Sequence, residues 1–179
     1  MRSLARTEAG VSADVTTSIR PLGQPGDLGW IIAAHGELYA AEYGWDTGFE
    51  AMVARIVADY AADHDPIHEA AWIAELDGVR VGCVLCVRDR EDDTGQTARL
   101  RVMLVDPAAR GQGLGTRLVQ TVLDFARSVG YRRVVLWTTD RQDAAGRIYV
   151  KAGFRLVAST PYPAFGDEMN DQTYELDLS

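Results

Sequence analysis

The sequence predicts an α/β domain with a mixed sheet, and three observations lead to this class. In the second half of the chain, short apolar runs of strand type alternate with amphipathic helical segments, a pattern that implies parallel strand pairing. Asp77 and Gly78 lie between two apolar runs, which predicts a hairpin and therefore antiparallel pairing. The chain has 179 residues, of which 47% are hydrophobic and 25% charged, as expected for one globular domain.

The first half predicts a tail, a strand, two helices and a hairpin. Residues 1–17 show no periodicity and are expected to form a flexible tail before a domain over 18–179. Pro21 indicates an edge or end position for the first strand. Asp27 is the expected N-cap of the first helix, and Gly44 its expected stop. The expected elements are a strand at 18–22, helices at 28–43 and 49–62, and hairpin strands at 71–76 and 79–87.

The second half predicts a strand–helix–strand–helix series and two closing strands. A polar loop over 88–96 leads into it, and Gly130 and Gly153 mark the ends of its two helices. The expected elements are strands at 98–105 and 133–138, helices at 116–129 and 143–151, and closing strands at 154–158 and 172–178.

The charge balance is acidic, with 18 Lys+Arg against 26 Asp+Glu and a net charge of −8. Nucleic-acid binding is not expected, because phosphate neutralisation needs a basic face. No apolar run approaches the roughly 20 residues that span a bilayer, and the N-terminus lacks the apolar core of a secretory signal. We therefore expect a soluble, cytoplasmic protein with small-molecule partners and no membrane, and the charge favours cationic ones. A homodimer is compatible with the sequence.

The cysteines and histidines predict no metal site. Cys83 and Cys86 are three residues apart in an expected strand, so their thiols should point to opposite faces and stay reduced. His64 and His68 would share a helical face, but Pro66 between them interrupts any helix.

A glycine-rich turn between a strand and a helix predicts a diphosphate site. After Val105-Asp106-Pro107, the chain carries Arg110 and then three glycines before the helix begins; these glycines are Gly111, Gly113 and Gly115. Glycines allow close backbone approach, and a helix N-terminus adds a partial positive charge that suits phosphate. The spacing fits neither the Rossmann nor the triphosphate-loop fingerprint. Taken alone, the segment also fits a plain strand-to-helix turn.

A second segment lies about 35 residues further on and reads Ala145-x-x-Ile148-Tyr149-x-x-x-Gly153-Phe154. Together with Arg110-x-x-Gly113-x-Gly115, it resembles the GNAT superfamily of N-acetyltransferases over most of residues 18–179. The resemblance implies a mostly antiparallel sheet with a central, splayed parallel strand pair, and acetyl-CoA as co-substrate without a metal. Narrower similarities, in Asp27–Trp45 and near the C-terminus, resemble the acetyltransferase half of MarR–GNAT fusion proteins. We expect a stand-alone version of that half.

The resemblance also implies which residues bind the co-substrate. Tyr149 matches the family tyrosine that protonates the departing thiolate, although an aromatic covering a helix end is the simpler structural role. Gln142 replaces the Asn common in the family, and its longer side chain puts that contact in question. The implied acetyl-CoA residues are Met103, Leu104, Val105, Arg110, Gly111, Gln112, Gly113, Leu114, Gly115, Thr116, Gln142, Ala145 and Tyr149.

The amine acceptor is expected near the first helix and the strand before the glycine turn. His35, Tyr39 and Glu42 share a helical face, where Glu42 could act as the base or bind an ammonium and His35 is a second base candidate. The same residues also fit an apolar helix face with Glu42 in solvent. Arg99 and Arg101 share a strand face with no carboxylate beside them, so Arg101 could bind a substrate carboxylate; a solvated pair is the alternative.

These features lead to a predicted acyltransferase that moves an acetyl group from acetyl-CoA directly onto a primary amine. The expected acceptor is a small molecule, either an amino acid or an amine-bearing metabolite. Two alternatives remain open at this stage, a non-catalytic acyl-CoA sensor and an N-acetyltransferase acting on proteins or peptides.

Overall fold

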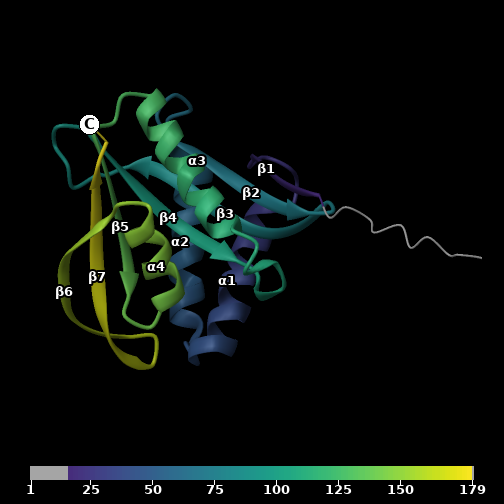
Figure 1. Cartoon of the computed structure of the whole chain (residues 1–179). Coiled ribbons are helices and arrows are strands. Elements are labelled where there is room, and N and C mark those ends of the chain that lie inside the picture. The colour runs from purple at the N-terminus through teal and green to yellow at the C-terminus, as the bar shows by residue number, and fades with distance from the viewer. Residues whose placement is uncertain (1–15, 179) are drawn as a thin grey trace, which may run out of the picture.

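The computed structural model describes residues 16–178 and confirms a mixed α/β fold built on a seven-stranded sheet (Figure 1). The sheet order is β1-β2-β3-β4-β5-β7-β6, and every neighbouring pair is antiparallel except β4 and β5. In chain order the elements are β1 (Thr17–Pro21), α1 (Asp27–Tyr43), α2 (Thr47–Asp63), β2 (Ala70–Leu76), β3 (Val79–Arg88), β4 (Thr97–Val105), a 3-10 turn (Pro107–Ala109), α3 (Leu114–Ser128), β5 (Arg133–Thr139), α4 (Asp143–Lys151), β6 (Arg155–Ala164) and β7 (Asp167–Asp177).

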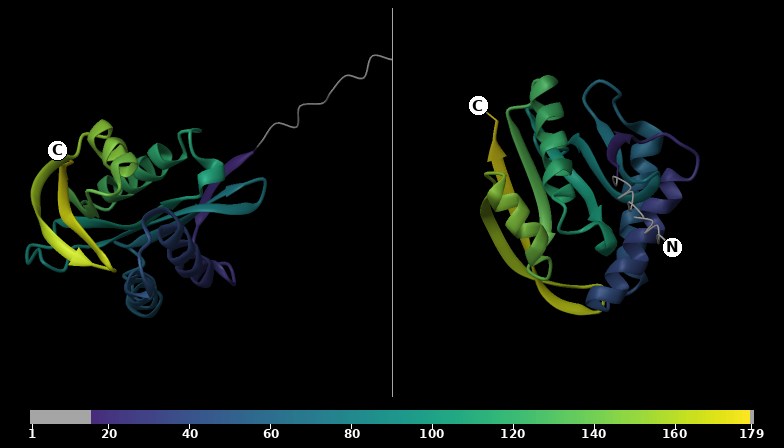
Figure 2. Two further views of the ribbon diagram at one scale, coloured as in Figure 1. Left: turned by 90° about the horizontal axis from the view of Figure 1, so that it is seen from below. Right: turned by 45° about the vertical axis from the view of Figure 1, so that its right-hand side comes forward.

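The helices cover both faces of the sheet, with α1 and α2 on one face and α3 and α4 on the other (Figure 2). Each face has its own apolar layer. One contains the buried Leu118 of α3, and the other contains the buried Ile31 of α1. Cys83 belongs to the α1 layer and Cys86 to the α3 layer, so the predicted opposite orientation of the two thiols is confirmed. Within residues 16–178, no helix is both long and apolar enough to cross a bilayer.

The turns that the sequence predicted at Asp77-Gly78 and at Gly44 are confirmed. Asp77 and Gly78 both have positive φ, 50° and 79°, as a two-residue hairpin turn requires. Gly44 ends α1 in the left-handed conformation. The tail boundary was placed slightly late, because Thr17 already pairs with Leu76 in β1; the rest of the predicted tail, residues 1–15, lies outside the described residues.

The N-cap of α1 is Gly26 and not Asp27, which the sequence predicted for that position. The Asp27 side chain is fully buried and binds the guanidinium groups of Arg20, at 2.9 and 3.0 Å, and Arg80, at 2.8 Å. It also accepts backbone hydrogen bonds from Gly23 and Gln24. The prediction of a local cap was therefore wrong, because the carboxylate neutralises two arginines that come from distant strands.

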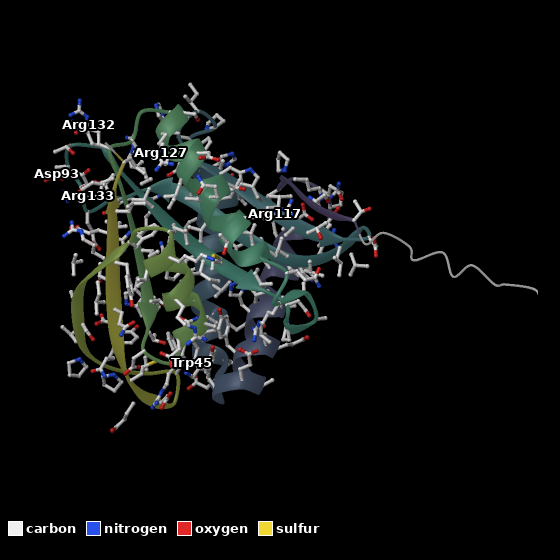
Figure 3. All side chains as sticks on the ribbon, in the orientation of Figure 1. Trp45, Asp93, Arg117, Arg127, Arg132 and Arg133 are labelled. Atoms are coloured by element: carbon white, nitrogen blue, oxygen red, sulfur yellow. The ribbon has the colours of Figure 1, made fainter. Side chains whose placement is uncertain are left out.

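The closing hairpin is longer than the two short strands predicted for it. β6 is an edge strand and tolerates Pro161 and Pro163, whose missing N–H groups are not needed on the free edge. At the hairpin tip, Phe165 packs 5.4 Å from Trp45 (ring centroids), and its carbonyl accepts a hydrogen bond from the Asp46 N–H. Trp45 lies near this tip in Figure 3. The hairpin is thus fixed against the loop between α1 and α2.

Candidate active site

The site is formed where β4 and β5 stop pairing. Their parallel ladder runs from Thr97–Arg133 to Leu100–Leu136, although both strands continue beyond it. In the same stretch β4 carries a bulge, where Val102 has φ 54° and the register against β3 shifts. The resemblance implied a splayed strand pair, and this interruption of the ladder gives the sheet its opening.

Two cavities meet at this opening. The first, of about 180 Å³, is lined from α1, α2, β4, β5, α4 and β6. The second, of about 350 Å³, extends along the end of β4 and the glycine turn to the start of α4. Tyr39, Met103 and Gln142 line both cavities and therefore mark the place where they join.

The glycine turn has the geometry of an anion cradle. Gly111 and Gly113 have φ of 78° and 74°, a conformation that only glycine adopts without strain. Gly113 is the N-cap of α3 and offers no side chain to the first N–H groups of the helix, which remain available to a phosphate. Gly115 has a different role, because a Cβ there would lie 2.7 Å from Ile148 Cδ1. It allows α3 to pack closely on α4.

The structure brings nearly all the predicted co-substrate residues together. Gln112 does not line the second cavity, and Tyr149 lines the first one instead. The predicted residues that do line the second cavity are Met103, Leu104, Val105, Arg110, Gly111, Gly113, Leu114, Gly115, Thr116, Gln142 and Ala145.

Arg110 links the turn to α1. Its Nε donates to the Val105 carbonyl at 3.1 Å, and its Nη1 lies 2.6 Å from Glu42 Oε1. Glu42 therefore lines the second cavity with Arg110, and the structure does not bring it together with His35 and Arg101 in the first. This position argues against Glu42 as the base or the ammonium partner, because its charge is engaged at the glycine turn.

We expect Glu42→Gln to tighten acetyl-CoA binding. The substitution removes a negative charge beside the phosphate cradle and frees Arg110 from its ion pair. A partly exposed ion pair is worth about 0.2–1 kcal/mol, which corresponds to roughly 1.4- to 5-fold in the Kd of acetyl-CoA. Calorimetric titration at low and at high salt measures this, with the larger gain at low salt. Glu37→Gln, an exposed residue of the same helix, is the control. Weaker binding by the Glu42 variant would mean that the pair shapes the turn instead.

Tyr149 is a buried phenol at the first cavity. Its side chain is 5% exposed and packs against Phe154 and Tyr174, with ring centroids 5.9 and 6.1 Å away. Burial, and then the nearby Tyr174, raise the pKa of Tyr149 well above its usual value. The hydroxyl is therefore fully protonated at neutral pH and can act only as a proton donor there.

Gln142 is oriented by its own local contacts. Its Oε1 accepts hydrogen bonds from Thr138 Oγ1 at 2.7 Å and from the Thr139 N–H at 3.3 Å. Since the carbonyl is engaged in this way, the amide NH₂ is the donor that faces the junction, where the Tyr39 hydroxyl is one partner within its reach. Its place at the junction keeps it within the predicted co-substrate set despite the replacement of Asn.

His35 is a neutral, buried imidazole at the wall of the first cavity. It is 2% exposed, and its Nδ1 lies 2.8 Å from the Ile31 carbonyl, which assigns the proton to Nδ1. Nε2 is buried and has no hydrogen-bond partner among residues 16–178. Burial lowers the pKa of His35 to about 4, so it offers an acceptor nitrogen and is a poor proton acceptor for an ammonium.

The two arginines of β4 both line the first cavity. Strand alternation also predicts Met103 on their face, but the bulge at Val102 interrupts the alternation, and Met103 packs against the α3 layer while Val102 packs against the α1 layer. Arg99 is engaged, with Nε 3.1 Å and Nη2 2.9 Å from Asp89 Oδ1 and Nη2 3.2 Å from Glu91. Arg101 makes no ion pair with any residue in the described part of the chain. The two positions are therefore not equivalent.

Sequence reasoning missed several residues of the first cavity. Trp137 on β5 and Tyr162 on β6 pack edge to face, with centroids 5.5 Å apart, and both line it. Tyr162 lies between two prolines in a segment where no strand was predicted, so only its aromatic character could have suggested a role. The other unpredicted lining residues are Met52, Val53, Ile56, Leu100, Val102 and Thr138.

Comparison with known proteins bears on this geometry. The chain is 40% identical over 95 residues to the N-acetylaspartate synthetase of Danio rerio, covering 53% of this chain and 33% of that protein. It is 32% identical over 123 residues to a probable N-acetyltransferase, camello, of Xenopus tropicalis, covering 66% and 55%. The chain thus spans between a third and about half of these relatives.

A putative acetyltransferase from Salmonella typhimurium, solved with its cofactor acetyl-CoA, has a similar fold. Its TM-score is 0.70 at 23% identity, and the match covers 91% of this chain and 94% of that one. The profile of the Acetyltransferase (GNAT) family matches residues 32–154, which include both sequence motifs, the bulged strand and the junction of the cavities. The chain belongs to this acetyltransferase family.

Proposed function

We propose that the protein transfers an acetyl group from acetyl-CoA to a primary amine of a small molecule by direct attack in a ternary complex. One observation carries the proposal: two cavities of different chemistry meet at Tyr39, Met103 and Gln142, with the Tyr149 phenol on the side of the first. The second cavity suits a phosphorylated thioester, and the first suits its acceptor.

The second cavity fits the parts of acetyl-CoA in order. The glycine turn and the free helix N–H groups suit the diphosphate. The end of β4, which has left its parallel partner, offers backbone groups of Leu104 and Val105 to the pantetheine arm. In this proposal the thioester lies near Met103 and Gln142, where the two cavities join.

The first cavity favours a small acceptor over a peptide. Its volume of about 180 Å³ lies below the roughly 300 Å³ of sites for drug-sized ligands. Tyr162 of the closing hairpin forms one wall, and the hairpin tip is fixed on Trp45 and Phe49. The name of the Danio rerio relative, an N-acetylaspartate synthetase, also points to an amino-acid acceptor.

The chemistry follows from these positions. The amine nitrogen attacks the thioester carbonyl, and a C–N bond forms while the oxygen takes negative charge. We propose that backbone N–H groups of Val102 and Met103, which have no register partners on β3 at the bulge, stabilise that oxyanion. The C–S bond then breaks, the Tyr149 hydroxyl gives its proton to the thiolate, and the nitrogen's surplus proton restores the phenol through water. The products are an N-acetyl amine and the free thiol of CoA.

The amine must arrive neutral, and the first cavity favours that form. None of its lining residues is a carboxylate, whereas Arg99 and Arg101 both are cationic. Positive charge nearby lowers the pKa of an amine, which otherwise is near 8 for an α-amino group and 10.4 for a lysine. We propose that His35 Nε2 accepts a hydrogen bond from the neutral amine and helps to aim its lone pair.

The pH dependence should follow the acceptor and not the protein. His35 has a pKa of about 4 and is neutral above it, so it should give no inflection near pH 6.5. We expect kcat/KM for the acceptor to rise with pH and level off near the amine's own pKa. Two acceptors with different amine pKa values, measured from pH 6 to 10, should show two different inflections. One shared inflection near neutrality would reveal a protein base.

Initial-velocity kinetics test the proposed direct attack. Varying acetyl-CoA at several fixed amine concentrations should give intersecting lines in double-reciprocal plots, as a ternary complex requires. Parallel lines would indicate an acetylated enzyme and contradict the proposal. Thiol release that does not depend on any amine would contradict the assignment of an amine acceptor.

Three broader expectations are part of this proposal. The N-terminal helix segment supports kinship with the acetyltransferase half of MarR–GNAT fusions. We further propose a cytoplasmic protein with no membrane or nucleic-acid partner, and the acidic composition supports the last of these. The compatibility of the chain with a homodimer is tested by light scattering of the purified protein.

A further inference from the structure

Arg101 is a half-buried cation on which the carboxylates of Asp59 and Asp89 act only from a distance. It lies on β4 just before the bulge, where it lines the first cavity and also a neighbouring cavity of about 200 Å³, whose lining includes Asp59, Glu69, Asp89 and Glu91. Burial, and then the neighbouring Arg99, lower the pKa of the Arg101 guanidinium, which nonetheless stays charged. Among residues 16–178 no carboxylate forms an ion pair with it. A partly buried charge of this kind is costly unless something pairs with it.

Arg99, on the same strand, differs from Arg101 because carboxylates form ion pairs with it. Two of its nitrogens contact one oxygen of Asp89, a residue that is itself 7% exposed, and Glu91 supplies a second carboxylate. The loop after β3 thus neutralises Arg99 and leaves Arg101 alone. Of the two arginines that line the first cavity, Arg99 is thus engaged in ion pairs and Arg101 is not.

We infer that the acceptor carries a carboxylate in addition to its amine, and that Arg101 binds this carboxylate. The inference rests on the proposed function and narrows its substrate class to amino acids. An arginine binds a carboxylate through two parallel hydrogen bonds, which fixes orientation as well as position. The first cavity itself is lined by no acidic residue and so offers purely cationic amines no carboxylate of its own; the nearest carboxylates line the neighbouring cavity on the other side of Arg99 and Arg101.

The spacing along β4 is compatible with such a molecule. Met103, at the junction with the second cavity, is two residues beyond Arg101 across the bulge at Val102, so their Cα atoms are at most roughly 7 Å apart. A carboxylate on the Arg101 side can then leave the amine at the junction, beside Gln142 and Tyr149. Arg101 would thereby set both the identity and the orientation of the acceptor, as a specificity-determining residue.

Matched acceptor pairs and Arg101→Gln test this inference. The pairs are L-alanine and L-methionine, each beside its α-carboxamide, and L-aspartate beside its diamide, all assayed by thiol release from acetyl-CoA. The wild type should prefer at least one acid over its amide by ten-fold or more in kcat/KM, and Arg101→Gln should abolish that preference. Each protein gives a ratio of kcat/KM for the acid to kcat/KM for its amide. Dividing the variant's ratio by the wild-type ratio cancels the difference in amine pKa between acid and amide. Arg101→Lys should restore part of the preference.

The control and a binding measurement keep the inference separable from the proposed function. Arg132→Gln removes an exposed arginine that directly precedes β5 (Figure 3). This variant should leave the acid preference unchanged. Calorimetry of the same amino acids against the protein saturated with CoA needs no turnover. Binding by acids only, lost in Arg101→Gln, supports the inference even if no acceptor reacts. Turnover of amines without preference for acids, or equal binding of acids and amides, overturns it and leaves the proposed function standing.

Discussion

Tyr149→Phe should lower kcat by about 10²-fold with little change in acetyl-CoA affinity. General acids contribute 10²- to 10⁴-fold, and the lower end applies because a thiol, with a pKa near 8.5, is a good leaving group. The phenol is buried at the first cavity and protonated at neutral pH, so the variant loses a proton donor and little packing volume. Steady-state kinetics and calorimetric titration of acetyl-CoA measure the two quantities separately.

Tyr174→Phe is the matched control for this variant. Tyr174 is also buried, packs against Tyr149 and loses only a hydroxyl, yet it lines neither of the two cavities. Its kcat should stay within about two-fold of the wild type. An unchanged kcat in Tyr149→Phe would show that the thiolate leaves without this donor. If wild type and Tyr149→Phe both bind acetyl-CoA but neither acetylates any amine, the protein is a sensor.

Asp27→Asn should cost about 3–5 kcal/mol of unfolding free energy, as expected when one partner of a buried ion pair is removed. The carboxylate is fully buried between Arg20 and Arg80, and the amide leaves two guanidinium groups without their shared counter-charge. Urea denaturation at pH 7 measures the change. Asp124→Asn, which removes an exposed ion pair with Arg127 on α3, should cost less than about 1 kcal/mol.

The same carboxylate predicts an acid dependence of stability. The hydrogen bond from Arg20 is the main cause that lowers the pKa of Asp27 far below the usual value near 3.9. Its contribution is therefore complete above about pH 4 and is lost as the pH falls towards the lowered value. The difference between wild type and Asp27→Asn should shrink over that range. A difference independent of pH would assign the loss to packing or to the backbone hydrogen bonds from Gly23 and Gln24.

Features encoded by neighbouring residues could be predicted from the sequence. The Asp77-Gly78 hairpin, the glycine stop of α1 and the bounds of α4 all depend on conformations that nearby residues impose. The glycine turn belongs to the same group, because a strand end, a proline and a helix start lie within a dozen residues. For this reason most of the predicted co-substrate residues line one cavity.

Features that depend on distant residues could not be predicted. The bulge at Val102 arises from pairing with β3, and the sequence of β4 alone reads as regular alternation. Glu42 and Asp27 looked like a base and a cap, yet arginines from other elements engage both. The state of Arg101 likewise depends on Asp89, which the fold gives to Arg99.

The measurement that tests the central claim most directly identifies the product. The purified protein is incubated with acetyl-CoA labelled in its acetyl carbons and with L-aspartate, L-alanine or L-methionine, and the products are analysed by mass spectrometry. We predict a labelled N-acetyl amino acid, formed in equal amount to the CoA thiol and strongly reduced in Tyr149→Phe. Thiol release without a labelled amide, or a labelled protein in place of a labelled small molecule, would contradict the account.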